Sequence, residues 1–276
     1  MTQISPVPAY TRTPRRLALR GIVVFTAALL AAGCATGRSA TVDPTATIST
    51  SAAATSAAAS DDFDPSAYPA LRPVPPPAGP TVECRYVPGG PATPRAEFSE
   101  VAPVATAGTV KMTLETTIGP IPLVLDRAKA PCAVNSFINL ARQGFFNRSA
   151  CDQLVDGPGT RLFTCGDPTG TGAGGPGYQF ADEYPVTSTS HSNGFLTPAL
   201  YPRGTLAMAS DGRADSNGSR FLLIFDDSVL LEQYTIFGTI DESALPPLAA
   251  AAGSGVESGS FGRGKPVTPV VINRVT

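Results

Sequence analysis

The sequence predicts a mainly β domain in its C-terminal part, built as a closed antiparallel barrel with two helical caps. Apolar and polar residues alternate around Val110, Met112 and Leu114, which is the period of a half-buried strand. Several more short apolar runs follow, separated by segments rich in turn-forming residues. Two helical patterns, one early and one late, bracket these runs, and closing the sheet into a barrel would leave no exposed strand edge.

The elements are expected in a simple order along the chain. The alternating run near Val110 and a second run, residues 121–125, form the first two strands. A helix then begins near Pro131 and ends before Gly144, since proline is favoured in a first turn and glycine just past a helix end. Further strands are expected at residues 153–154, 162–165, 205–209, 221–225, 234–240 and 267–275, with a second helix at residues 245–252.

Residues 1–33 have the composition of a secretory signal. Four arginines precede the apolar run 21–30, which is too short to span a bilayer as a helix. The last residue of the run, Leu30, begins the sequence Leu-Ala-Ala-Gly-Cys at residues 30–34. This sequence resembles a bacterial lipobox, in which the cysteine is acylated and becomes the new N-terminus. We therefore expect an exported protein that is anchored to the outer face of the cell membrane by a lipid on Cys34.

Residues 34–82 are expected to be a flexible tether. They are rich in Ala, Ser, Thr and Pro and cannot bury enough apolar surface to offset the entropy of ordering. Residues 83–107 are interpreted as an N-terminal extension of the domain, and residues 108–276 as the domain itself. The formal net charge is −2, and removal of the four leader arginines makes the mature chain more acidic. This balance argues against nucleic-acid binding, and we expect a monomer.

The cysteines support export. Four remain once Cys34 is set aside, an even number that suits an oxidising compartment and allows three pairings. Cys151 and Cys165 fall on neighbouring predicted strands, so we pair them, and Cys84 with Cys132. A zinc site is not expected, because the chain has one histidine and no Cys-x-x-Cys.

Two other sequence features resemble functional motifs, but the residues around them do not fit the corresponding sites. Residues 170–175 match the glycine pattern of dinucleotide-binding loops, but Gly-Pro-Gly at residues 175–177 cannot open the helix that such a site needs. His191 has no nucleophile elbow to accompany it, so a serine hydrolase is not indicated. We expect no cofactor and no metal.

From about Gly108 to the C-terminus the chain resembles a cyclophilin. The resemblance rests on Gly-Asp-Pro-Thr-Gly-Thr-Gly at residues 166–172, Gly-Thr-Leu-Ala-Met-Ala at 204–209, Gly-Pro-Gly-Tyr at 175–178 and Asn-Gly-Ser at 217–219. It implies an eight-stranded antiparallel barrel capped by two helices, and isomerisation of X-Pro bonds. In the family an apolar pocket holds the proline ring, and an arginine donates toward the prolyl nitrogen in the twisted transition state.

The resemblance also implies the site positions. The catalytic arginine position is Gln153, and the glutamine that faces it in the family is Arg220. Val229 stands at the position of a pocket tryptophan, so the expected pocket lacks aromatic walls. The substrate-binding positions are Leu162, Thr164, Ala209, Ser210, Leu222, Leu230 and Tyr234.

Two roles for Arg220 stay open. Its guanidinium could donate toward a prolyl amide from the opposite strand, in place of the missing arginine at Gln153. Alternatively it pairs with Asp152 or Asp211 at the rim, where an exposed ion pair contributes little.

The sequence therefore predicts a membrane-tethered isomerase with weakened turnover that acts on proline-containing segments of exported proteins. The alternatives are a non-catalytic module that binds extended or proline-containing segments of cell-envelope proteins, and a structural role in which the pocket is unused.

Overall fold

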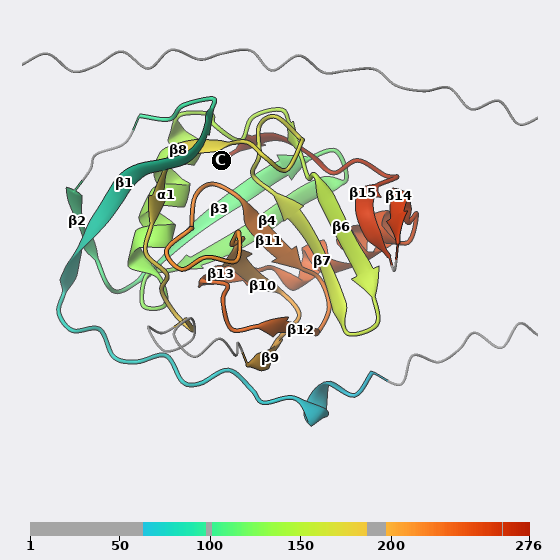
Figure 1. Ribbon diagram of the computed structural model, residues 1–276, viewed down its shortest axis with the longest axis horizontal. Helices are drawn as coiled ribbons and strands as arrows, with labels where there is room; N and C mark the ends of the chain where they lie inside the picture. The colour runs from blue at the N-terminus through green and yellow to red at the C-terminus, as the bar shows by residue number, and fades with distance from the viewer. Residues whose placement is uncertain (1–62, 98–100, 187–196, 261) are drawn as a thin grey trace, which may run out of the picture. The chain divides into compact units, whose positions relative to one another are not determined.

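The computed structural model describes residues 63–97, 101–186, 197–260 and 262–276, and its main feature is an antiparallel sheet that curls on itself (Figure 1). The strands of this sheet are β3 (Thr109–Thr116), β4 (Gly119–Asp126), β5 (Ser149–Ala150), β6 (Gln153–Gly157), β7 (Thr160–Cys165), β10 (Thr205–Met208), β11 (Phe221–Ile224), β13 (Ile236–Ile240), β14 (Val256–Ser260), β15 (Arg263–Pro266) and β16 (Val271–Val275). From one edge to the other they follow the order β14-β15-β6-β7-β11-β10-β13-β4-β3-β16-β5.

The short strands β5 and β6 close the sheet. They follow one another in the chain, yet β5 pairs with β16 and β6 pairs with β7. The segment that contains both is therefore bonded to both ends of the series β7-β11-β10-β13-β4-β3-β16. Counted as one strand, it completes a barrel of eight, and the predicted fold class is confirmed.

Two α-helices accompany the barrel in the described residues, α1 (Pro131–Arg142) and α3 (Leu245–Ala252), both at the predicted positions. Gly144 follows α1 with a φ of 69°, a conformation that favours glycine. Glu183 accepts hydrogen bonds from the backbone N–H of Cys132 at 3.0 Å and of Ala133 at 2.8 Å, donors that the first helical turn cannot satisfy itself. Within the described part of the chain, every helix falls short of the length and apolar character that a membrane span needs.

Strands outside the barrel are not predicted by the sequence pattern. The strands β1 (Thr81–Thr93), β2 (Val101–Ala105) and β8 (Gly175–Phe180) form a separate three-stranded sheet, while β9 (Pro198–Tyr201) and β12 (Ser228–Leu231) form a two-stranded ribbon. Both expected disulfides are present, with S–S distances of 2.03 Å for Cys84–Cys132 and 1.99 Å for Cys151–Cys165. The first of them joins β1 to α1.

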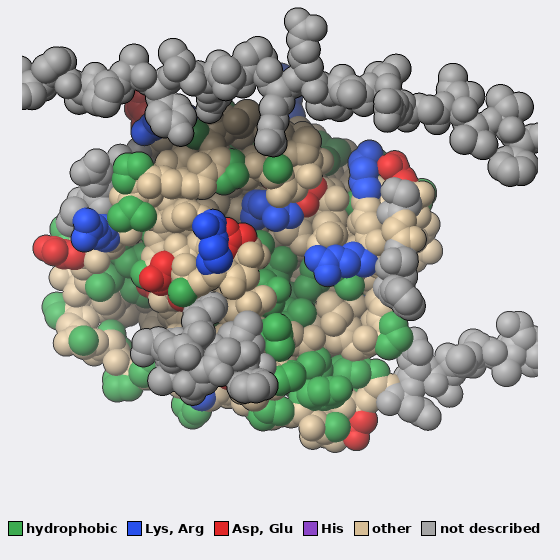
Figure 2. Space-filling model, in the orientation of Figure 1, with side chains coloured by type: hydrophobic (Ala, Val, Ile, Leu, Met, Phe, Trp, Pro, Cys, Tyr) green, Lys and Arg blue, Asp and Glu red, His purple; other side chains and the backbone are tan. Residues whose placement is uncertain are grey.

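The chain packs onto the domain earlier than the predicted tether boundary allows. Residues 63–80 belong to the expected tether, yet Pro65–Ala67 form a 3₁₀ turn and Leu71 packs against an apolar cluster of the domain. In Figure 2 hydrophobic side chains gather over the part of the molecule where Figure 1 places β9 and β12, beside this segment. The signal, Cys34, the earlier part of the tether and His191 lie outside the described residues.

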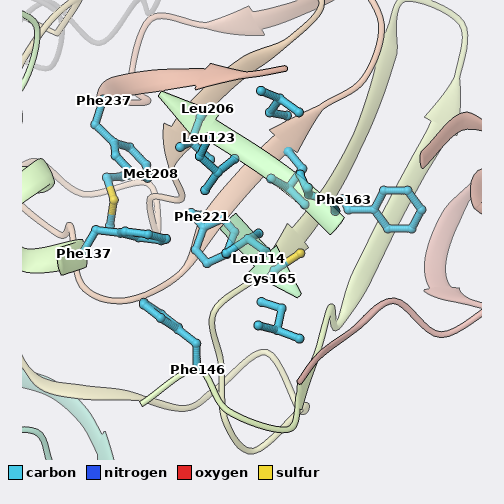
Figure 3. Packing of buried hydrophobic residues seen from close by; sticks show 14 of the residues in the cluster. Leu114, Leu123, Phe137, Phe146, Phe163, Cys165, Leu206, Met208, Phe221 and Phe237 are labelled. Carbon is cyan, nitrogen blue, oxygen red and sulfur yellow. The ribbon is translucent and has the colours of Figure 1, made fainter. Parts of the chain in front are cut away.

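The barrel interior is filled by aromatic and aliphatic side chains. Phe221 lies with its ring centroid 5.4 Å from that of Phe137 on α1 and 5.7 Å from that of Phe146 (Figure 3). Phe163 and Cys165 of β7 belong to the same buried cluster. Because side chains alternate across a strand, Leu162 and Thr164, which alternate with Phe163 and Cys165 along β7, face the outside of the barrel.

Candidate functional site

The predicted site residues form a row on the outer face of four neighbouring strands. Gln153 of β6 is paired in register with Thr164 of β7, Thr164 with Leu222 of β11, and Leu222 with Ala207 of β10. Paired residues in a sheet point to the same side. The polar position Gln153 therefore lies at one end of the row and an apolar surface at the other.

That apolar surface is a second hydrophobic cluster, separate from the barrel interior, which we call the outer cluster. Its buried members are Leu162, Tyr201, Ala207, Leu222, Ile224 and Ile236, and the half-buried side chains packed against them are Leu71, Val155, Tyr184, Ala209, Leu230 and Tyr234. Five of the seven predicted substrate-binding residues are thus brought together. The other two lie beside it, since Thr164 is paired with Leu222 and Ser210 follows Ala209.

Aromatic side chains contribute to the outer cluster. Tyr201 of β9 is fully buried in the outer cluster, its ring centroid 6.3 Å from that of Tyr234. Val229, the residue at the tryptophan position, is not a member of the cluster, whereas its neighbour Leu230 is. Tyr234 is expected at the site from the resemblance. Tyr201 comes from a segment that the resemblance does not cover with motifs, so only the folded ribbon β9–β12 reveals it.

Gln153, which the sequence predicts at the position of the family's catalytic arginine, carries no charge of its own. Gln153 is half-buried, and its side-chain oxygen accepts a hydrogen bond from the guanidinium of Arg263 on β15 at 3.3 Å. Arg263 did not emerge as a site residue from the sequence, because it reaches Gln153 only through the pairing of β15 with β6.

Arg220 binds Asp152, one residue before Gln153. Its Nη2 lies 2.5 Å from a carboxylate oxygen of Asp152, and the two side chains are 28% and 6% exposed. This is the ion pair that the sequence left open as one alternative, but it is largely buried and does not lie at an exposed rim. Burial raises the pKa of Asp152 above its ordinary value, although the charge of Arg220 lowers it. The geometry favours a structural pairing of Arg220 over donation to a substrate.

A small cavity lies beside this ion pair. Its volume is about 150 Å³. Buried polar atoms without a partner among the described residues gather next to it, namely Oδ1 of Asp152, Oγ of Ser219 and Nε of Arg220. The cavity is lined by Gly90, Pro91, Gly172, Gly174, Gly175, Pro176, Tyr178, Gln179, Ala209, Ser210, Asp211, Ser216, Gly218, Ser219 and Arg220.

The glycine-rich loop that forms one wall of the cavity is held by Asp167. Its carboxylate accepts hydrogen bonds from the backbone N–H of Thr169 at 2.8 Å, Thr171 at 3.2 Å and Gly174 at 3.0 Å. Burial raises the pKa of Asp167, but these hydrogen bonds outweigh it and leave the pKa below its usual range. The loop is thus a series of turns whose backbone N–H groups donate to the carboxylate of Asp167. This agrees with its interpretation as a glycine-rich loop.

The barrel, the outer cluster and the loop together define a class of protein in which a closed β-barrel carries an apolar cluster on its outer face. The family model described as "Cyclophilin type peptidyl-prolyl cis-trans isomerase/CLD" matches residues 109–276. The chain therefore belongs to the cyclophilin family of peptidyl-prolyl isomerases. Peptidyl-prolyl isomerase activity is the function that this membership and the relatives support.

Curated relatives from two mycobacterial species carry the description "Probable peptidyl-prolyl cis-trans isomerase B". The protein from Mycobacterium tuberculosis is 42% identical over 210 residues, which cover 75% of this chain and 68% of the relative. The protein from Mycobacterium leprae is 41% identical over 211 residues, which cover 76% and 64%. A crystal structure of a cyclophilin type isomerase from Cryptosporidium parvum is 26% identical with a TM-score of 0.47, covering 61% of this chain and 97% of that one.

The similarity to the mycobacterial relatives is longer than the family domain. The family model already ends at the last residue, Thr276, so the additional matched residues lie N-terminal to Thr109. The relatives therefore share part of the N-terminal region that the family domain leaves out.

Proposed function

We propose that the chain is a peptidyl-prolyl isomerase with weakened turnover that acts on X-Pro bonds of exported proteins. The observation that carries the proposal is Gln153 at the catalytic arginine position, with the nearby Arg220 held by Asp152. The reaction needs no cofactor, because it is a rotation about an amide with a barrier of about 18–20 kcal/mol. What it needs is a surface that grips the proline and a donor that stabilises the twisted amide.

The outer cluster supports the first requirement and Gln153 weakens the second. A neutral amide donates a weaker hydrogen bond than a guanidinium does, by about a factor of two in energy. Loss of one preorganised donor lowers rates by about 10²–10³ in comparable sites. The expected rate is therefore well below that of a family member that keeps the arginine.

Exchange spectroscopy on an Ala-Pro peptide with the full chain tests this proposal. We expect slow but measurable exchange, which should disappear in Leu222→Asp, because packing a proline ring on the outer cluster would then require desolvation of a carboxylate. Arg220→Ala should leave the measured rate unchanged if Arg220 serves only Asp152. A wild-type rate equal to that of an arginine-containing family member would contradict the proposal.

The alternative is a binding module without catalysis. The tyrosines of the outer cluster favour it, because aromatic side chains bury a large area at a small entropy cost. In that case the Ala-Pro peptide would bind, seen as concentration-dependent shifts of its resonances, without any exchange above the uncatalysed rate.

We further propose that the protein is exported and anchored to the outer face of the cell membrane by a lipid on Cys34. The lipobox-like sequence supports this, and two disulfides suit an oxidising compartment. Cys34→Ala should move the protein from the membrane fraction to the soluble fraction. An unmodified Cys34 in the mature protein, found by mass spectrometry, would refute the anchor.

A further inference from the structure

A segment from outside the family domain lies on the outer cluster. We call residues 69–72 the strap. Its Leu71 packs against the outer cluster, and the carbonyl oxygen of Pro69 accepts a hydrogen bond from the N–H of Leu200 at 3.0 Å. Ala70 and Leu200 form a parallel bridge, so the strap runs in an extended conformation beside β9 (Figure 1).

Arg72 fixes the end of the strap through three polar contacts. Its carbonyl oxygen accepts a hydrogen bond from the hydroxyl of Tyr184 at 2.6 Å. Its guanidinium donates to the carbonyl oxygen of Pro185 and lies 3.6 Å from the carboxylate of Glu232. Such a part-exposed ion pair adds little stability, so its effect is to set the position of Leu71 along β9.

These contacts are the ones that a bound peptide makes. When a peptide adds to a strand, main-chain hydrogen bonds supply affinity and a recess for one side chain supplies specificity. The strap bonds to Leu200 of β9, whose pairing within the domain is to β12. Its one large aliphatic side chain meets the cluster that contains Leu162 and Leu222, where the family resemblance places contacts to the proline ring.

We propose that the strap is a resident ligand of the outer cluster, and that the cluster binds extended segments in which an aliphatic side chain is followed directly by an arginine or lysine. This inference rests on the proposed function in taking the outer cluster as the peptide-binding surface. The strap is joined to β1 by only a short stretch of chain, and such tethering gives an effective concentration on the order of millimolar. A separate peptide of the same chemistry must therefore displace it.

Binding of a fluorescently labelled peptide that copies residues 67–75 to the full chain tests the proposal. The wild-type chain should bind it weakly, because the strap competes. In Leu71→Ser the strap loses its apolar anchor, and the Kd for the peptide should fall by about tenfold or more. A peptide that carries the same Leu-to-Ser replacement should bind neither chain.

Val74→Ser provides the matched control, since it removes an aliphatic side chain three residues further on that is not a member of the outer cluster. Its peptide affinity should equal that of the wild type. Arg72→Glu should strengthen peptide binding less than Leu71→Ser does, because only the contacts that position Leu71 are lost. Hydrogen exchange of the Leu200 amide gives a second readout, protected in the wild type and faster in Leu71→Ser.

The outcomes separate this inference from the isomerase proposal. Equal peptide affinities of the wild type and Leu71→Ser, with unchanged protection of Leu200, would overturn the strap as a ligand and leave the exchange measurement on Ala-Pro unaffected. Absence of peptide binding to both chains would also overturn it. Conversely, the Leu71→Ser chain could bind the peptide tightly and yet never catalyse exchange. That result would support the proposal that the strap is a ligand and refute the proposal of catalysis.

Discussion

The inside and the outside of this barrel are built from the same strands but completed in different ways. On β11, Phe221 packs inside against Phe137 and Phe146, while the next residue, Leu222, belongs to the outer cluster. The interior takes most of its members from the family domain. The outer cluster also takes Leu71 from the N-terminal segment. The fold can therefore stay intact while the outer face changes its chemistry.

The two regions also differ in how well their buried polar atoms are hydrogen-bonded. Four buried side-chain atoms lack a partner among the described residues, and three of them belong to Asp152, Ser219 and Arg220 beside the cavity on the outer side. Unsatisfied buried polar atoms are rare in folded proteins, and they often mark sites with a role beyond packing. Most of the unpartnered buried polar atoms of the described residues thus lie beside this cavity.

The largest effect is expected from the interior. Phe221→Ala should lower the free energy of unfolding by about 3–5 kcal/mol, because it opens a cavity among three packed rings. Leu222→Ala, one residue away and facing outward, should lower it by only about 2 kcal/mol and reduce peptide binding instead. Denaturant unfolding of both variants measures the difference. Equal losses would show that the two faces are not energetically distinct.

Removal of a disulfide should give the next largest loss of unfolding free energy. Replacing both Cys84 and Cys132 by serine should lower the free energy of unfolding by about 4 kcal/mol, and replacing Cys151 and Cys165 by about 3 kcal/mol. The first value is larger because that bond closes the longer loop, with a sequence separation of 48 against 14. Thermal unfolding without reductant tests the order, and a larger loss for the shorter loop would contradict the chain-entropy argument.

The buried ion pair of Arg220 with Asp152 should contribute less to the free energy of unfolding than the core does, but more than an exposed ion pair. Arg220→Leu leaves the carboxylate of Asp152 buried without a cation, and should lower the free energy of unfolding by about 2 kcal/mol at neutral pH. Burial already raises the pKa of Asp152, and loss of Arg220 should raise it further, so the destabilisation should shrink as pH falls and the carboxyl becomes protonated.

Arg161 offers the matched control for that variant. It pairs with Asp226 at 2.9 Å, but both side chains are nearly half exposed. Arg161→Leu should therefore change the free energy of unfolding by less than about 1 kcal/mol, with little dependence on pH. Equal destabilisation by the two variants would mean that burial does not distinguish the pairs.

A further effect, which depends on pH, is expected at Glu183. Burial raises its pKa to about 7, although the N–H groups of Cys132 and Ala133 lower it. The folded state then binds more protons than the unfolded state between about pH 4.5 and 7, so the free energy of unfolding should fall as pH rises, by at most about 1.4 kcal/mol per pH unit. Glu183→Gln should lack this contribution. Parallel pH profiles of the two proteins would contradict the assignment.

Sequence patterns anticipate the barrel because each of its strands alternates or forms a short apolar run with turns on both sides. They miss β1 because Pro88, Gly89, Gly90 and Pro91 interrupt it, and such residues are unusual within strands. They miss the strap because Leu71 stands alone in a run rich in alanine and proline, so no periodicity marks it.

The site was anticipated in part for a related reason. The motifs place Leu162, Leu222 and Leu230 correctly in one cluster, since the strands that hold them are predictable. The ion pair of Arg220 with Asp152 was one of two open alternatives, and sequence cannot tell how deeply a charged side chain is buried. The contact of Arg263 with Gln153 depends on strand pairing between residues more than 100 positions apart, which no local pattern encodes.

The exchange rate of Gln153→Arg tests the central claim most directly, namely that the barrel is kept while the outer face lacks its donor. On an Ala-Pro peptide this variant of the full chain should exchange about tenfold faster than the wild type or more, because a guanidinium replaces a neutral amide at the donor position. Gln143→Arg, at the exposed end of α1, is the matched control and should leave the rate unchanged. A wild-type rate that is already high and does not rise in Gln153→Arg would contradict the account.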